Sequence, residues 1–146
     1  MIDINTYLEV KLEDVADFER AKKGKVYPAG SSYIQISATR GQIGFLYEPG
    51  TIKSKDVVII PQAGIDRYYF NIILQRNINE FINKYSTGIN IQEKEIANFP
   101  IQLHGYVEQV TIAKIVRQMD NRYKEKESEV ENIKQLKKGL LSKMFV

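Results

Sequence analysis

The sequence predicts an α+β fold, in which a compact domain with a small mixed β-sheet and a packed helix precedes a long C-terminal helix of the coiled-coil type. Two contrasts along the chain support this prediction. Residues 1–105 alternate short apolar runs with Gly, Pro, Ser and Asn, which is typical of short strands joined by turns. Residues 107–145 lack proline, contain a single glycine and carry dense charge, which is typical of a long exposed helix. We therefore expect two domains, residues 1–105 and residues 106–146.

Three segments of the first region have the character of strands. In "SYIQISA", Ser32 to Ala38, apolar and polar residues alternate. The segment "GQIGFLYEPGT" predicts a strand bounded by glycine and followed by a turn at Pro49 and Gly50. The run "DVVIIP", residues 56–61, is continuously β-branched, and this pattern predicts a buried strand that ends at its proline.

The remaining segments of this region mix helical and strand patterns. "EDVADFERA" fits either a helix or a short strand with a turn, and both remain open. "DRYYFNIILQRNINEFINKYS" has apolar residues near helical spacing, so it forms one helix or two short ones. Loop-forming residues follow, with a helix start at "EKE", and a short strand is expected from Phe99 to Leu103.

The C-terminal region carries a heptad pattern that calls for a packing partner. A helix from Thr111 to Phe145 would extend ~50 Å at ~1.5 Å per residue, which is more than a small domain can cover. We expect the first turns, with Ile112 and Ile115, to pack on their own domain and the later turns to pack on a partner helix. The a and d positions, which include Lys126 and Lys137, are spaced three and four apart. The predicted interface residues are Val116, Met119, Tyr123, Val130, Ile133, Leu136, Leu140, Leu141 and Met144.

The composition excludes several classes of protein. A chain of 146 residues with 43% hydrophobic and 27% charged residues is expected to be globular. It contains no cysteine and one histidine, His104, so disulfide scaffolds, cysteine nucleophiles and multi-histidine metal sites are excluded, and no metal site is predicted. No apolar run approaches the ~18 residues of a membrane span, and the N-terminus lacks the pattern of a signal peptide. We expect a cytoplasmic protein.

The sequence also lacks complete catalytic motifs. It has no glycine-rich phosphate loop. The loop of an adenine methyltransferase requires two adjacent prolines, and the four prolines of this sequence are never adjacent. "EKE", Glu93 to Glu95, has no upstream Pro-Asp partner that would complete a nuclease site. His104 has no neighbouring serine or cysteine to activate, which suggests a loop or interface histidine. We therefore predict that the chain is not an enzyme.

Polar and basic residues gather in three loop segments, where they suit contact with a polyanion such as DNA. Arg, Gln and Asn side chains can bind base edges, and Ser, Thr and Lys side chains can hold phosphates. Each segment also has a simpler explanation, as a solvated turn, a polar connection between strands or a helix end. The predicted DNA-binding residues are Arg20, Lys22, Lys23, Lys25, Tyr27, Ser31, Tyr33, Gln35, Thr39, Arg40, Gln42, Ser86, Thr87, Asn90 and Gln92.

Three segments together resemble the specificity (S) subunit of type I restriction–modification systems, in a half-length form. "YLEVKLEDVADFERAKKGK" is similar to the entry of a target recognition domain, and "TGINIQEKEIANFPI" is similar to its exit. Residues 107–145 resemble the family's conserved long helix, although "PIQLHGYV" replaces the usual proline-rich linker before it. The matching positions in the helix are Glu108, Gln109, Ile112, Ala113, Ile115, Asp120, Leu136, Lys137, Lys138, Gly139, Leu140, Leu141, Met144 and Phe145.

The resemblance implies a non-catalytic DNA-recognition protein. Residues 1–105 would be the target recognition domain, and residues 106–146 would be the helix for dimerisation and subunit assembly. A homodimer would read a palindromic, interrupted site, because the symmetry of the protein imposes symmetry on the site. The implied partners are duplex DNA, a methyltransferase (M) subunit and a restriction (R) subunit. S-adenosylmethionine and ATP with Mg²⁺ would belong to those subunits, and this chain would hold no cofactor.

Two other classes of protein remain open at this stage. The chain could be a coiled-coil adaptor whose globular head binds a protein or peptide, or a small nuclease or methyltransferase. The sequence leaves the DNA target and the spacer length undetermined. It also does not decide between a natural half-subunit and a fragment of a longer chain, although Met1 and the form of the C-terminus favour an intact chain.

Overall fold

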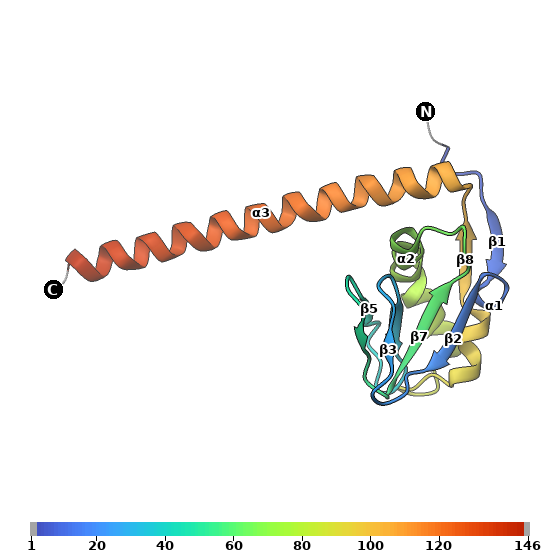
Figure 1. Ribbon diagram of the computed structural model, residues 1–146. Coiled ribbons are helices and arrows are strands. Elements are labelled where there is room, and N and C mark those ends of the chain that lie inside the picture. The colour runs from blue at the N-terminus through green and yellow to red at the C-terminus, as the bar shows by residue number, and fades with distance from the viewer. Residues whose placement is uncertain (1–2, 145–146) are drawn as a thin grey trace. The chain divides into compact units, whose positions relative to one another are not determined.

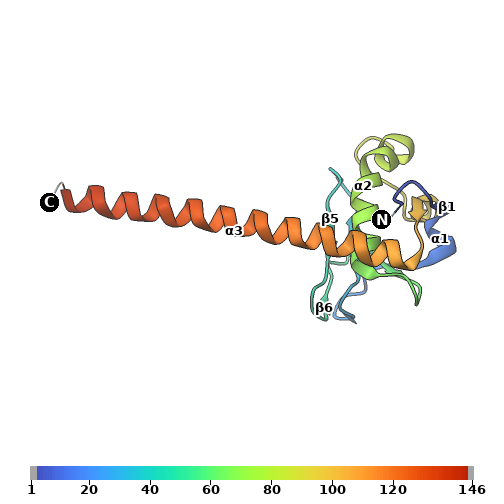
Figure 2. The same cartoon turned by 90° about the horizontal axis from the view of Figure 1, so that it is seen from above.

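The computed structural model in Figures 1 and 2 describes residues 3–144, with side chains described up to residue 142. The chain divides into two compact units, residues 1–113 and residues 114–146. The first unit contains short strands and helices, and the second, as far as residue 144, is the continuation of one long helix. The predicted α+β class is therefore confirmed.

A four-stranded sheet forms the centre of the first unit. Its order is β2 (Ala16–Arg20), β7 (Asp56–Pro61), β4 (Ser32–Gln35) and β5 (Ile43–Phe45). Every strand pairing that the structure describes is antiparallel, so the expected mixed sheet is wrong. A parallel pair needs a long crossover, usually through a helix, and the one long helix of this unit follows β7, the last strand of the sheet.

Two small ribbons flank this sheet. The first pairs β1 (Leu8–Lys11) with β8 (Pro100–Leu103), which is the short strand expected near the end of the domain. The second pairs β3 (Val26–Tyr27) with β6 (Gly50–Thr51), which begins at the predicted Pro-Gly turn. The ambiguous segment "EDVADFERA" contains most of the one-turn helix α1 (Leu12–Val15) and then β2.

Helix α2 (Arg67–Tyr85) is a single helix that covers one face of the sheet (Figure 1). It begins where the Asp66 carboxylate accepts a hydrogen bond of 2.8 Å from the Tyr69 backbone N–H, which is a typical N-cap. Its Asn71 amide donates to Ser32 Oγ at 2.9 Å and to the Gly44 carbonyl at 3.1 Å, which ties the helix to β4 and β5. The residues that it buries include Tyr69, Phe70, Leu74 and Phe81.

The opposite face of the sheet carries a second, smaller core. Side chains alternate between the faces of a strand, so Val58 and Ile60 of β7 point away from the face that α2 covers. They pack with Tyr27 and Ile52 from the β3–β6 ribbon and its continuation. This ribbon therefore covers part of the second face and leaves the remainder of that face open to other contacts.

A 3₁₀ helix η1 (Glu93–Asn98) precedes β8, and helix α3 (Tyr106–Met144) follows it. The first two turns of α3 belong to the first compact unit, where Gln109 and Ala113 are buried. The Gln109 amide donates to the His104 carbonyl at 2.8 Å, and its oxygen accepts from the Asp66 backbone N–H at 2.9 Å. One side chain thus joins the start of α3 to the start of α2.

None of the helices between residues 3 and 144 combines the length with the apolar character that crossing a membrane requires. This finding covers the part of the chain that the structure describes.

We expect Gln109→Ala to destabilise the first unit by about 1–3 kcal/mol, because the Asp66 N–H and the His104 carbonyl would lose their partner inside the fold. Chemical denaturation followed by circular dichroism measures the change in the free energy of unfolding. Gln118→Ala, at an exposed position of the same helix, is the control and should change it by less than about 0.5 kcal/mol. Equal effects of the two substitutions would contradict this role of Gln109.

Candidate nucleic-acid interface

The strand register brings several loops to one end of the four-stranded sheet. Arg20 at the end of β2 pairs with Val57 near the start of β7, and Gln35 at the end of β4 pairs with Asp56. Residues 20–25, 36–42 and 53–56 therefore meet at this end, which is the lower end of the sheet in Figure 1. We call this region, together with residues 87–90, the loop edge.

Two of the predicted polar segments join at the loop edge through hydrogen bonds. The Ala38 backbone N–H donates to Asn90 Oδ1 at 2.9 Å, and the Thr39 N–H donates to the Ile89 carbonyl at 2.9 Å. Ala38 has a positive φ of 50°, which is uncommon for a residue with a side chain. The segments around Arg40 and Asn90, which are distant in sequence, thus form one surface with exposed Arg40, Thr87 and Asn90.

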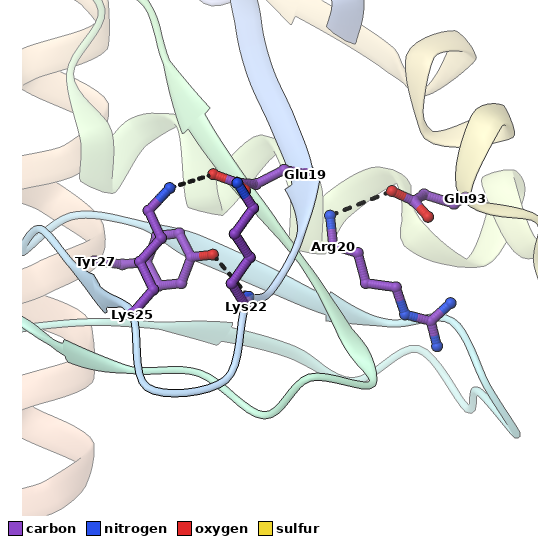
Figure 3. A network of polar contacts seen from close by, with 6 residues as sticks. All are labelled: Glu19, Arg20, Lys22, Lys25, Tyr27 and Glu93. Carbon is purple, nitrogen blue, oxygen red and sulfur yellow. Dashed lines mark hydrogen bonds and ion pairs between the residues drawn. The ribbon is translucent and has the colours of Figure 1, made fainter.

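The basic turn after β2 is partly neutralised by its own neighbour (Figure 3). Glu19 pairs with Lys25 at 2.7 Å and with Lys22 at 3.4 Å. The hydrogen bond from Lys25 lowers the pKa of Glu19, and the same bond raises the pKa of Lys25. The sequence alone suggests a free basic cluster, but in the structure two of its four cations already have a carboxylate partner.

Arg20 links this turn to other parts of the loop edge. Its backbone N–H donates to Glu93 Oε1 at 3.2 Å, as Figure 3 shows, and its Nε donates to the Ser54 carbonyl at 3.1 Å. This second bond holds the loop before β7, so that Lys53 and Lys55 lie beside the cluster. Both lysines are exposed. These two lysines were not among the predicted residues, because "KSK" is a short polar loop whose closeness to Arg20 depends on the pairing of β2 with β7.

A cavity of about 400 Å³ opens on the second face of the sheet at the loop edge. Three of the predicted DNA-binding residues, Tyr33, Gln35 and Gln42, line this cavity. Lys53 and Lys55, which were not predicted, line it as well. The other lining residues are Ile43, Gly44, Thr51, Ile52 and Asp56. Amide, carboxyl and ammonium groups thus converge in a hollow, which suits the recognition of a polar ligand.

Asp56 is the most unusual group in this cavity. The residue is 6% exposed, and its Oδ1 has no hydrogen-bond partner. Burial raises the pKa of Asp56, while the positive charges of Lys55 and Lys53 act in the opposite direction. A buried carboxyl without a partner is costly, so its presence is a feature that requires an explanation.

Three of the predicted DNA-binding residues lie inside the fold, so the prediction that their side chains contact DNA is wrong. Tyr27 is 1% exposed and its hydroxyl accepts from the Lys22 backbone N–H at 3.0 Å. Ser31 is fully buried and donates to the Pro28 carbonyl at 2.8 Å. Thr39 is buried, and its Oγ1 accepts from the Gly41 N–H at 3.3 Å. These residues shape the loops and do not present side chains to a ligand.

The remaining predicted residues reach the surface to different degrees. Tyr33, Gln35 and Ser86 are half-buried, and Gln35 donates to the Ser37 carbonyl at 2.9 Å. The exposed residues are Arg20, Lys22, Lys23, Lys25, Arg40, Gln42, Thr87, Asn90 and Gln92.

His104 is a loop residue, as expected, because it lies between β8 and α3, and its side chain is buried within the first unit. Its ring nitrogens lie 2.5 Å from Tyr69 Oη and 2.8 Å from the Ile4 carbonyl, so the ring is held within the first unit. Between residues 3 and 142, no three His, Asp or Glu side chains gather in a way that could hold a metal ion.

The predicted seam of α3 is apolar and exposed. Its exposed fractions are 62% for Met119, 65% for Tyr123, 52% for Val130, 64% for Ile133, 74% for Leu136, 61% for Leu140 and 43% for Leu141. Val116 is half-buried, and the side chain of Met144 lies outside the described residues. An exposed apolar stripe of this length on one helix indicates an interaction surface.

Comparison with known proteins identifies the fold. No protein-family model and no curated protein matches the sequence. Among solved structures, the S subunit of a type I restriction–modification system from M. genitalium is 17% identical, with a TM-score of 0.66 over 88% of this chain and 42% of that subunit. The HsdS subunit from Thermoanaerobacter tengcongensis is 15% identical, with a TM-score of 0.63 over 84% and 39% of the two chains.

A third structure describes the assembly and conformational transition of the type I restriction–modification system. It is 16% identical, with a TM-score of 0.66, and the match covers 84% of this chain and 40% of that one. This chain thus has the fold of type I restriction–modification S subunits, as the resemblance in sequence implied. It spans about two fifths of the length of these structures.

We expect Asp56→Asn to stabilise the protein at neutral pH. Because the folded state raises the pKa of Asp56, the carboxyl destabilises the fold once pH exceeds its ordinary pKa of about 4, and this penalty grows until pH passes the raised value. The difference in unfolding free energy between variant and wild type should therefore increase between pH 3 and pH 7. Denaturant titrations at several pH values measure it.

Asp17→Asn provides the matched control, because Asp17 is an exposed carboxylate on β2 of the same sheet. The stabilisation expected of Asp56→Asn should be absent from Asp17→Asn, because Asp17 is not buried. A wild-type protein that gains stability relative to Asp56→Asn as pH rises would contradict the assignment.

Proposed function

We propose that this chain is the DNA-recognition subunit of a type I restriction–modification system, in a half-length form that has no catalytic activity of its own. The single observation that carries the proposal is the fold, which the chain shares with S subunits over 84–88% of its length. The loop edge adds independent support, because it brings exposed cations and amide side chains to one surface.

The chemistry of the loop edge suits duplex DNA. Lys53, Lys55 and Lys23 are exposed cations that can neutralise phosphates and so fix the protein on the backbone. Arg40, Gln42 and Asn90 have side chains that can bind base edges in the major groove. The hydrogen bonds between residues 36–39 and 89–91 hold two of these segments together before DNA binds.

We propose that two copies associate through the seam of α3. The exposed apolar side chains from Met119 to Leu141 supply the surface, and burial of such residues drives association. Because each copy spans about two fifths of an S subunit, a two-fold dimer would present two recognition units and would read a palindromic site with an interruption.

The other partners follow from the same proposal. The dimer would direct an adenine methyltransferase subunit and a restriction subunit to the site, in the cytoplasm. S-adenosylmethionine and ATP with Mg²⁺ would be bound by those subunits.

The exposed seam also suits a second class, a coiled-coil adaptor whose head binds a protein or peptide. The two proposals differ in their response to salt, because DNA binding releases counterions in proportion to the phosphates neutralised.

We expect the purified chain to bind duplex DNA with an affinity that falls steeply as salt rises. Lys53→Gln and Lys55→Gln should each weaken binding and reduce the slope of log K against log[salt] by about 1 if each lysine contacts one phosphate. Fluorescence anisotropy with a labelled duplex pool measures this slope. Lys11→Gln, on the β1–β8 ribbon, is the control and should leave the slope unchanged.

The absence of salt-sensitive binding by the wild-type chain would overturn the DNA proposal and favour the adaptor. Equal effects of Lys11→Gln and the two loop-edge substitutions would place the DNA contact elsewhere on the protein.

We expect Ile133→Asp with Leu140→Asp to convert a dimer to a monomer in sedimentation, because two carboxylates would be buried in an apolar seam. The first unit should keep its thermal transition. Gln135→Asp with Ser142→Asp introduces the same groups with the same spacing at positions off the seam, and this variant should remain a dimer. A dimer that survives the seam substitutions would show that the copies associate through another surface.

A further inference from the structure

Three polar side chains form a row across the loop edge on the second face of the sheet. Gln35 at the end of β4 pairs with Asp56 at the start of β7, and the Gln35 backbone N–H donates to the Gln42 carbonyl at 3.4 Å. All three residues line the cavity of about 400 Å³. The antiparallel register therefore brings one carboxyl group and two amide side chains to the lining of one cavity.

The surroundings of this row define an open site. The β3–β6 ribbon packs on Val58 and leaves the end of β7 that carries Asp56 facing the cavity. The ring of Tyr33 lies against Gly44, where a Cβ atom would overlap it, so glycine at this position leaves room for the ring. Lys53 and Lys55 also line the cavity.

The chemistry of the Asp56 carboxylate limits which ligands can bind it. An ionised carboxylate only accepts hydrogen bonds, so it needs a donor. In the major groove, cytosine presents its N4 amino group and adenine its N6 amino group, whereas thymine O4 and guanine O6 are acceptors. A carboxylate therefore favours the amino-bearing bases and disfavours the keto-bearing ones.

We propose that Asp56 is a specificity-determining residue, and that the cavity receives the major-groove edge of a base with an exocyclic amino group, cytosine or adenine. This inference rests on the proposed function and specifies one position of the DNA site. Lys53 and Lys55 hold the adjacent phosphates, which keeps the carboxylate from repelling the DNA. Because Oδ1 is enclosed, the base would donate its hydrogen bond to Oδ2, the other oxygen of the carboxylate.

The proposal explains why the fold retains a costly carboxyl at this position. Burial raises the pKa of Asp56 in the free protein. A hydrogen bond donated by a base to this carboxylate would favour its ionised form.

The test is a selection from a pool of duplexes with randomised positions, carried out with the wild-type chain, Asp56→Asn and Asp17→Asn. We expect the wild type to prefer cytosine or adenine at one position of each half-site by about tenfold over thymine or guanine. Asp56→Asn should lose this preference at that position and keep the preferences elsewhere, because an amide both donates and accepts. Asp17→Asn should select the same site as the wild type.

The outcomes separate this inference from the proposed function. A wild-type chain that selects no motif overturns the proposed function, and the inference with it. A wild-type motif that Asp56→Asn selects unchanged overturns the inference alone. Retention of the wild-type thermal transition, or a higher one, by Asp56→Asn shows that a lost preference does not come from unfolding.

Discussion

The pairing of β7 with its two neighbours is the constraint on which the first unit depends. Val57, Val58 and Ile59 are at most 1% exposed, so this strand is buried on both faces and its register with β2 and β4 is fixed. A slip of one residue would turn Asp56 toward the core beneath α2. The same register brings Arg20, Gln35 and Lys55 to one end of the sheet. The stability of the core and the geometry of the loop edge thus have a common origin.

Burial separates the polar residues of the loop edge into two groups with different roles. Ser31 and Thr39 use their hydroxyl groups within the fold, and Tyr27 accepts a hydrogen bond from the turn that contains Lys22. Lys53 and Lys55 are exposed and line a cavity. Serine, threonine and tyrosine serve equally well as ligands or as internal hydrogen-bonding groups, so residue type alone cannot assign them. Asp56 belongs to neither group, because it is buried and incompletely partnered.

The first turns of helix α3 bury Gln109 and Ala113 in the first unit, whereas its later turns are exposed. Its first turns are held by Gln109, whose two hydrogen bonds link it to Asp66 and His104. Its later turns expose an apolar seam, and their charged residues do not cover it. Among the described residues, a Cβ atom added at Gly139 would meet nothing within 4 Å beyond the backbone of its own helix, so packing within the monomer does not require a glycine there. A glycine costs about 1 kcal/mol relative to alanine in a helix, and close approach of a second helix would account for it.

The sequence by itself determined the α+β class, the strand at residues 56–61, the helix that starts near residue 67 and the long C-terminal helix, because periodicity and β-branched runs reflect local geometry. It also indicated that polar segments around Arg40 and Asn90 serve a common surface. Only the tertiary structure decided that the sheet is antiparallel, that Glu19 neutralises part of the basic turn and that Lys53, Lys55 and Asp56 share a cavity. These properties depend on contacts between residues far apart in the chain, and such contacts leave no periodic pattern in the sequence.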